Sequence, residues 1–448
     1  EQEQAVQYFY EPFLKEYDPE LRKELGVWYT PPEIVQYQVE RVDRVLREEL
    51  HIADGLADEQ VVILDPCCGT GAYLVETLKR IHKTLQEKGR SALTAQKLKK
   101  AASERVFGFE ILPAPFVISH LQIGLMLRLL GAPFNPDHDE RAGVYLTNAL
   151  TGWEPPKEPK KQLPLFPEMM QERDAADKVK QETPILVILG NPPYNAFAGR
   201  SPEEEGGLVD PYKEGLTTPE RDGGWGVKKF NLDELYVRFF RIAERRIVNN
   251  GRGVVCYISS FSYLSGQSFV VMRKHLLDGF DKVFIDCMNG DSRETGKLTP
   301  EGKPDPSVFS TEQSPVGIRV GTAICLMVRK EERLANPVVR LRHFWGVTKR
   351  QNIVDSLELD NIERVYQTAE PTRMNRYSFR PSVVSRAYLE WPRTVALAGT
   401  NPFNGPIERR GNSLIVLPDE RARLDLLIPY LDGCYSDTEV EGIAPAFM

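Results

Sequence analysis

Strand-length apolar runs alternate with segments of helical periodicity between residues 61 and 329. Uninterrupted runs such as Val61–Leu64 and Ile185–Leu189 are typical of strands that are buried on both faces. This alternation predicts an α/β fold with a doubly wound, Rossmann-like sheet that carries helices on both faces. The remaining expected strands are Arg105–Phe109, Gly143–Leu146, Gly253–Ile258, Lys282–Met288 and Gly321–Arg329, and the expected helices are Ala72–Glu87, Ala114–Leu130, Leu232–Val248 and Phe269–Leu277.

The flanks of this region have a different pattern. Aromatic residues at helical spacing predict a helix over residues 3–17, within an N-terminal helical segment, residues 1–28. A second helix is expected to run to about Leu50, with Thr30 as its N-cap, a proline in its first turn and Glu33 completing a capping box. The main domain is expected over residues 29–345, with a surface insertion at 153–183 and an active-site loop at 195–231, followed by a mixed C-terminal extension at 346–448.

Composition and charge restrict the class of protein. The chain has 448 residues, of which 41% are hydrophobic and 27% charged, as in an ordinary globular protein of two or three domains. No apolar run is long enough for a membrane helix, and the scattered cysteines indicate a reducing cytoplasm rather than disulfides or a metal site. A net charge of −7 argues against a purely DNA-binding protein, but it is compatible with an enzyme whose basic groups surround one cleft.

A glycine-containing turn follows the first predicted strand. The sequence Asp65-Pro-Cys-Cys-Gly69-Thr-Gly71 joins that strand to a helix, and its glycines allow a ligand to approach the backbone closely. An acidic residue at the strand end would repel a pyrophosphate, whereas it would suit a ligand with a cationic centre such as an aminoacyl sulfonium. A plain structural turn is the alternative interpretation of this motif.

Polar residues also end the next two predicted strands. Glu110 follows the second strand, where a carboxylate can accept hydrogen bonds from both hydroxyls of a ribose. Asn148 follows the third strand and could pair with the edge of an adenine. Since parallel strands end at the same edge of a sheet, we expect these residues to lie near Asp65.

The tetrad Asn191-Pro192-Pro193-Tyr194 directly follows a buried strand. The two prolines restrict the backbone, so that the Asn191 side-chain carbonyl and the Pro192 backbone carbonyl can converge on one point. Two such acceptors can hold the hydrogens of an amino group and stabilise the positive charge that develops on its nitrogen. Tyr194 offers a flat surface on which a flipped base can stack.

Together, these two motifs resemble the signature of amino-group DNA methyltransferases. With Tyr29-Thr30-Pro31 upstream, their order resembles that of the gamma class of N6-adenine enzymes. Further stretches, over about residues 8–410, resemble the modification module of type ISP restriction–modification enzymes and related phage-defence methylases. The stretches are Tyr8–Thr30, Trp153-Glu-Pro-Pro, Gly226-Val-Lys-Lys-Phe-Asn-Leu-Asp-Glu-Leu-Tyr and Pro402-Phe-Asn-Gly-Pro.

The resemblance implies a class I methyltransferase fold, S-adenosyl-L-methionine as cofactor, and double-stranded DNA with a flipped adenine as substrate. Nuclease, helicase and recognition modules accompany this module in the type ISP group, so we expect the chain to be a fragment or a processed form. The resemblance implies catalysis by Asn191, Pro192 and Tyr194, with Phe309 as a second stacking ring. The residues expected to bind the cofactor are Tyr29, Thr30, Pro31, Asp65, Cys67, Gly69, Gly71, Glu110, Ile111, Asn148, Ala149 and Asn191.

Two other hypotheses remain open at this stage. The same tetrad also serves enzymes that methylate cytosine N4, guanine N2 in RNA or the side-chain amide of a protein glutamine, although the last two lack the segment around Thr30. A non-catalytic subunit that binds cofactor or DNA is the other alternative, and the intact tetrad argues against it.

Overall fold

The computed structural model describes residues 29–89, 93–138, 140–154, 167–194, 207–311 and 316–382, and short stretches between 384 and 439. Residues up to Ser382 belong to one compact unit, and Val383–Met448 form a second unit in which a short helix, α12 (Arg386–Leu389), is described. The helix expected over residues 3–17 and the Pro402 motif lie outside the described residues.

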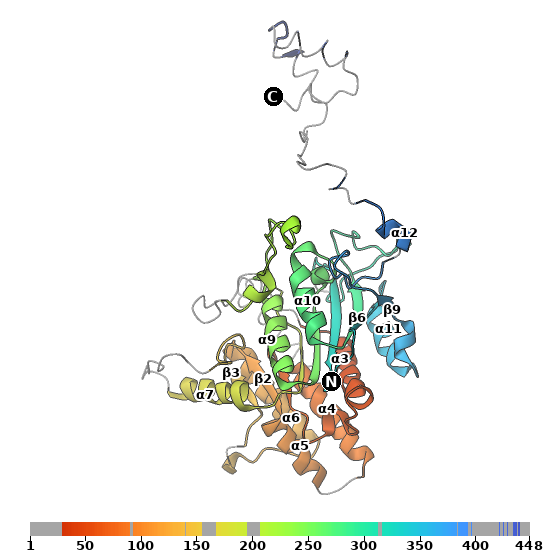
Figure 1. Cartoon of the computed structure of the whole chain (residues 1–448). Coiled ribbons are helices and arrows are strands. Elements are labelled where there is room, and N and C mark those ends of the chain that lie inside the picture. Colours follow the sequence, from red (N-terminus) through yellow and green to blue (C-terminus); the bar gives the residue numbers. More distant parts are fainter. Residues whose placement is uncertain are drawn as a thin grey trace. The chain divides into compact units, whose positions relative to one another are not determined.

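The described part of the first unit forms a nine-stranded sheet in the order β3-β2-β1-β4-β5-β7-β6-β8-β9 (Figure 1). The strands β3, β2, β1, β4 and β5 are parallel, whereas β7 is antiparallel to its neighbours β5 and β6. The strands are β1 (Ile63–Asp65), β2 (Val106–Glu110), β3 (Val144–Leu146), β4 (Val187–Gly190), β5 (Gly253–Ser260), β6 (Lys282–Asn289), β7 (Thr322–Arg329), β8 (Val338–His343) and β9 (Gln367–Ala369).

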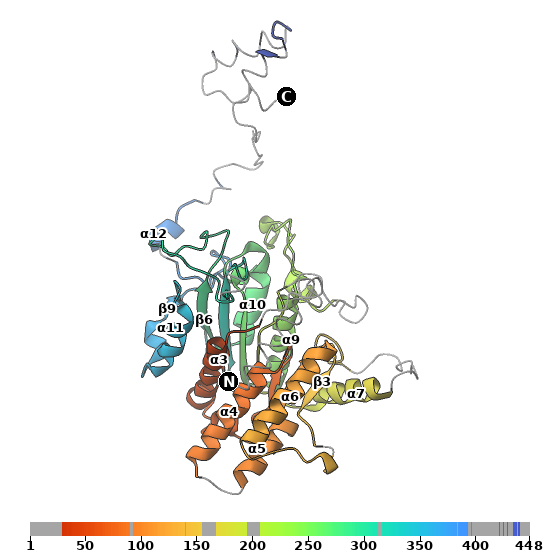
Figure 2. The same cartoon turned by 180° about the vertical axis from the view of Figure 1, so that it is seen from behind.

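Helices cover both faces of this sheet (Figures 1 and 2). Successive strand residues alternate between two cores: Ile63 packs with the helices of one face and Leu64 with those of the other. The first face carries α3 (Pro32–Glu48), α4 (Ala72–Glu87), α5 (Leu93–Glu104), α6 (Pro113–Leu129) and α11 (Lys349–Asp355), and the second carries α7 (Pro167–Glu182), α9 (Leu235–Asn250) and α10 (Val270–Gly279). The predicted doubly wound α/β architecture is therefore confirmed.

One feature of the first helix differs from its prediction. The helix α3 begins at Pro32, with Pro31 as the N-cap residue and no side-chain capping bond, so the capping role expected for Thr30 is wrong. The carbonyl of Pro31 accepts the first helical N–H groups, those of Ile34 and Val35. The Thr30 hydroxyl instead accepts a hydrogen bond from Asn191.

The order of the strands determines where a ligand can bind. Chain connections run outward from β1 in one direction and from β4 in the other, so a crevice opens beyond the carboxyl ends of these two neighbouring strands. Asp65 is the last residue of β1 and Gly190 the last residue of β4. The loop Asp65–Gly71 and the tetrad Asn191–Tyr194 therefore both begin at this crevice.

Candidate active site

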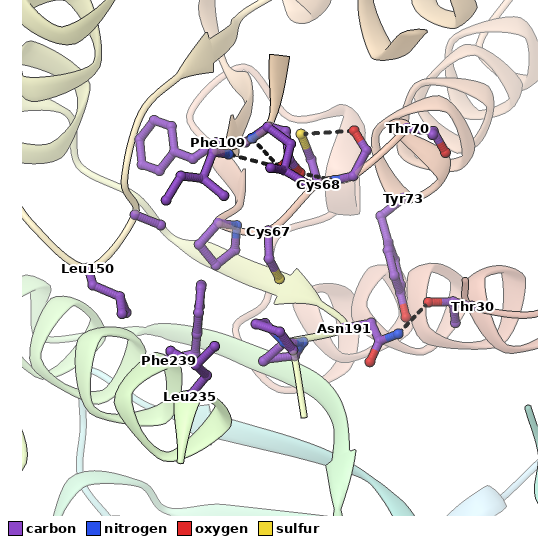
Figure 3. Close-up of a pocket in the computed structure, with 18 of the residues that line it drawn as sticks. Thr30, Cys67, Cys68, Thr70, Tyr73, Phe109, Leu150, Asn191, Leu235 and Phe239 are labelled. Carbon is purple, nitrogen blue, oxygen red and sulfur yellow. Dashed lines mark hydrogen bonds between the residues drawn. The ribbon is translucent and has the colours of Figure 1, made fainter. Parts of the chain in front are cut away.

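A cavity lies at the carboxyl ends of β1, β2 and β4 (Figure 3). It encloses about 1050 Å³ between protein atoms, including the part that is open to solvent. Most of the residues predicted to bind cofactor or substrate line it. They are Tyr29, Thr30, Cys67, Gly69, Glu110, Ile111, Asn148, Ala149, Asn191, Pro192 and Tyr194, whereas Pro31, Asp65, Gly71 and Phe309 are not in its wall.

Asp65 lies directly behind the wall that Cys67 forms. Its side chain is buried, with Oδ1 accepting the Cys67 backbone N–H at 3.0 Å. The other oxygen, Oδ2, is buried and has no hydrogen-bond partner among the described residues. Burial raises the pKa of Asp65 to about 7, hydrogen bonds from Cys67 oppose this rise, and the nearby Glu110 carboxylate adds to it. A buried acid that lacks a cationic partner is well suited to a ligand that brings a positive charge.

The glycines of the first loop shape its backbone. Gly69 has φ +54° and Gly71 has φ +90°, which is left-handed backbone that side chains disfavour. The turn directs the Gly69 N–H to Glu110 Oε2 at 2.9 Å. Gly71 caps α4 and packs against Ser119, where a Cβ would lie 3.1 Å from the serine Cβ.

Glu110 is held by backbone N–H groups. Its Oε1 accepts hydrogen bonds from Ile111 and Leu112 at 2.8 Å each, while Oε2 accepts the one from Gly69. Burial raises the pKa of Glu110, and these three backbone bonds oppose the rise. Since a carboxylate has about four lone-pair directions, Oε2 retains capacity for one further donor such as a hydroxyl.

Asn148 and Ala149 form part of the wall after β3. Asn148 Oδ1 accepts the N–H of Leu150 at 2.9 Å, which fixes the turn. Lys180 of α7 stabilises this turn, because its ammonium donates hydrogen bonds to Thr147 Oγ1 and to the Asn148 carbonyl, each at 2.9 Å. Lys180 is fully buried, and its role was not predicted because it lies in a charged segment that resembled a surface insertion.

The side chain of Asn191 is oriented by Thr30. Asn191 Nδ2 donates to Thr30 Oγ1 at 3.0 Å, which places the amide oxygen on the side away from Thr30 (Figure 3). The two residues are 161 positions apart in the sequence, with Asn191 directly after β4 and Thr30 two residues before α3. Thr30 thus contacts the predicted transfer site as well as the cavity.

Tyr194 and Phe309 lie beside each other. Their rings meet edge to face, with 5.9 Å between centroids and 75° between planes. Tyr194 lines the cavity and is partly buried, whereas Phe309 is 3% exposed and packs in the core. Phe309 therefore supports the edge of Tyr194, and direct stacking of Phe309 on a base stays a prediction.

Several residues of the cavity were not predicted from the sequence. Tyr73 comes from the first turn of α4, while Leu235 and Phe239 come from α9 on the other face of the sheet. The spacing of Leu235 and Phe239, one helical turn apart, is a signal that they share a face, but it also fits an ordinary core helix. Phe109, also in the wall, directly precedes Glu110, the last residue of β2.

Comparison with protein families concerns the N-terminal third of the chain. Residues 1–128 match the model of the N-6 DNA Methylase family. The resemblance that the motifs indicated is thereby confirmed for this part. A comparison with curated proteins gave no match.

Solved structures share the fold over most of the chain. A type ISP restriction–modification enzyme, LlaBIII bound to DNA, is 21% identical with a TM-score of 0.66, over 84% of this chain and 24% of its own. The DrdV–DNA complex is 23% identical with a TM-score of 0.64, over 84% and 33%, and LlaGI with a DNA substrate mimic is 22% identical with a TM-score of 0.61, over 82% and 28%. The chain thus spans a quarter to a third of these three proteins.

None of the helices in the described ranges combines the length and the apolar character that a membrane span requires.

Proposed function

We propose that this chain transfers the methyl group of S-adenosyl-L-methionine to the N6 amino group of an adenine flipped out of double-stranded DNA. The observation that carries the proposal is the position of Asn191. It directly follows β4, which pairs with the strand that Asp65 ends, and its amide is oriented by Thr30 at the edge of a cavity that reaches Glu110. The family match of residues 1–128 supports the same chemistry.

The donor fits the chemistry of the cavity residues. When bound, it supplies an electrophilic methyl group on a positively charged sulfur. Asp65 would offset that charge, since its buried carboxylate has no cationic partner among the described residues. Glu110 Oε2 would accept a ribose hydroxyl, while Ile111, Asn148 and Ala149 would contact the adenine.

The tetrad that begins at Asn191 is assigned to bind the amino group that accepts the methyl group. The Asn191 amide oxygen and the Pro192 backbone carbonyl would accept the two hydrogens of the target amino group, which localises its lone pair on nitrogen. As positive charge develops there, these two dipoles stabilise it without a strong base. Once the N–CH₃ bond has formed and the S–CH₃ bond has broken, the methylated nitrogen would release one proton to water, and S-adenosylhomocysteine would leave as the neutral thioether. Tyr194 would stack on the flipped base, with Phe309 holding the edge of the ring.

We further propose that the chain is the modification part of a restriction–modification or phage-defence system. It spans only a quarter to a third of three solved proteins that share its fold, two of which are type ISP restriction–modification enzymes. Nuclease, helicase and sequence-recognition functions would then come from modules outside this chain, and the C-terminal extension at 346–448 would lead toward the recognition module.

Titration calorimetry and a transfer assay test the proposal together. The chain should bind S-adenosyl-L-methionine and S-adenosylhomocysteine but not NAD, and it should place labelled methyl on N6 of adenine in DNA digested to nucleosides. Asn191→Ala should abolish transfer while leaving donor affinity within about threefold, since one transition-state contact is lost. Transfer at the parent rate by this variant, or label in another base, in RNA or in protein, would overturn the assignment.

A further inference from the structure

The turn after β3 forms one end of the cavity and lies against helix α7. Its four residues from Thr147 to Leu150 all line the cavity, at the end where the adenine of the proposed donor would lie. Helix α7 runs beside β3, the strand at one edge of the described sheet (Figures 1 and 2). None of the described residues of α7 is in the cavity wall, so this helix can act on a ligand only through the turn.

Lys180 connects α7 to this turn. Its ammonium donates hydrogen bonds to Thr147 Oγ1 and to the Asn148 carbonyl, each at 2.9 Å. It also lies 5.2 Å from the centroid of the Phe109 ring, and the carboxylate of Asp177 is 3.6 Å away. Because Lys180 is fully buried, its ammonium has no hydration shell, and its charge-assisted hydrogen bonds restrict the position of the turn.

Two further carbonyls of this segment are held in the same way. Trp153 Nε1 donates to the Ala149 carbonyl at 2.7 Å, and Gln181 of α7 donates to the Gly152 carbonyl at 2.9 Å. Gly152 has φ +76°, and a Cβ at this position would clash with the Asp177 carboxylate, so the backbone approaches α7 closely. The turn is therefore preorganised before any ligand binds.

We propose that Lys180 is a positioning residue, which holds the turn Thr147–Leu150 in the shape that receives the adenine of the methyl donor. The inference rests on the proposed function, because that function places the adenine beside this turn. Loss of the ammonium would remove two hydrogen bonds from the turn and allow it to shift away from the adenine. The adenine is far from the bond that breaks, so its contacts contribute equally to the ground state and the transition state.

Lys180→Met tests this inference, because it keeps most of the buried stem and removes the ammonium. We expect calorimetric affinities for S-adenosylhomocysteine and for 5′-methylthioadenosine, which lacks the amino acid, to fall by the same factor of about ten. The KM for the donor should rise to a similar extent, whereas the single-turnover rate of methyl transfer at saturating donor should stay within about threefold of the parent. Lys180→Gln keeps a neutral NH₂ donor, so its loss of affinity should be smaller, about threefold.

Lys349→Met is the matched control. Lys349 is also buried, and its ammonium donates to the Met288 carbonyl and pairs with Asp305, both at 2.6 Å and outside the cavity. This variant removes a buried ammonium without touching the turn, so both affinities should stay within about threefold of the parent. An equal loss of affinity in Lys349→Met and Lys180→Met would overturn the inference, because general destabilisation would then account for both.

A second readout needs neither ligand nor methyl transfer. Hydrogen exchange of the backbone amides between Tyr145 and Trp153 should be faster in ligand-free Lys180→Met than in the parent, and unchanged in Lys349→Met. Unchanged affinity or unchanged exchange in Lys180→Met would overturn the inference even if the chain methylates DNA. If Lys180→Met does not fold, the same two measurements on Lys180→Gln decide. Weakened binding and faster exchange in a chain that transfers no methyl group would overturn only the proposed function.

Discussion

Asp65 and Gly190 end the neighbouring strands β1 and β4 so close together that a Cβ on Gly190 would lie 2.6 Å from Asp65 Oδ1. A carbon and an oxygen atom that are not bonded to each other do not lie this close in proteins. The position of the Asp65 carboxylate therefore requires a glycine directly before the tetrad. The proposed donor site and the proposed transfer site are therefore connected by direct packing. Any side chain at residue 190 must displace the carboxylate or the strand end.

Gly190→Ala should weaken donor binding. The added methyl carbon would clash with Asp65 Oδ1 and would lie 3.4 Å from the nearby Cys67 Sγ. Both side chains would have to shift. We expect donor affinity in calorimetry to fall about tenfold or more, because the displaced carboxylate can no longer offset the charge of the ligand. Gly124→Ala is the control, since Gly124 lies in α6 with open space around its Cβ position and ordinary helical φ. Equal affinities for both variants would contradict this packing argument.

Asp65→Asn should raise the stability of the ligand-free protein while weakening donor binding. Burial raises the pKa of Asp65 from its ordinary 3.8 to about 7, so between these pH values the unfolded chain has released a proton that the folded chain retains. Stability is therefore lost as pH rises through this window, by up to about 4 kcal/mol for complete burial. The variant should unfold at a higher temperature than the parent at pH 8 and at a similar temperature at pH 4. A variant that is less stable at pH 8 would assign Asp65 a structural role instead.

Much of the fold was predictable because, in its central part, the periodicity of the apolar residues and the length of each segment indicate the same type of element. Helix α4 has the bounds expected from the sequence, and the strands β1 to β7 lie within a few residues of their predicted positions. Buried parallel strands are short and uniformly apolar, so their sequence pattern is clear. The cavity also brings together most of the residues predicted for it, because polar residues at strand ends share one edge of the sheet.

The parts that were missed depend on contacts between distant segments. Strands β8 and β9 have mixed polarity at the edge of the sheet, and only pairing with β6 and with each other defines them. The capping role expected for Thr30 was predicted from its neighbours in the sequence. In the structure its hydroxyl instead contacts Asn191, which lies 161 residues away in the chain. Tyr73 gave no signal in the sequence, because tyrosine is intermediate between the residue types that are usually buried and those that are usually exposed. The domain boundaries and the role of the C-terminal extension stay predictions.

Tyr194 should tolerate loss of its hydroxyl but not of its ring. The hydroxyl is buried without a hydrogen-bond partner among the described residues, so Tyr194→Phe should retain transfer within about threefold of the parent. Tyr194→Ala removes the proposed stacking surface and should lower kcat/KM for DNA about ten- to a hundredfold. Fluorescence of 2-aminopurine at the target position, which rises when that base leaves the stack, should increase with the parent and with Tyr194→Phe only. An equal rise in fluorescence with Tyr194→Ala would show that base flipping does not depend on this residue.

The buried pair Arg342–Asp286 should contribute strongly to stability. Arg342 Nε lies 2.5 Å from Asp286 Oδ1, and the hydroxyls of Tyr37 and Tyr366 donate to the same carboxylate at 2.7 Å. This cluster ties α3, which follows Thr30, to β6 and β8. Arg342→Met would remove the cation that is hydrogen-bonded to this buried carboxylate and leave Arg41 as the other nearby cation, and we expect the free energy of unfolding in urea to fall by about 3–5 kcal/mol.

A double-mutant cycle distinguishes loss of this pair from loss of packing. Asp286→Leu in the Arg342→Met background removes the uncompensated charge, so it should restore part of the stability that the single variant loses. Arg340→Met on the same strand is the control, because Arg340 is partly exposed and lies 3.8 Å from Glu363, and it should cost about 1 kcal/mol or less. If Arg342→Met is no more destabilising than Arg340→Met, the cluster does not anchor α3. Donor binding measured on the same variants would then be unaffected, whereas an anchored α3 predicts that affinity falls together with stability.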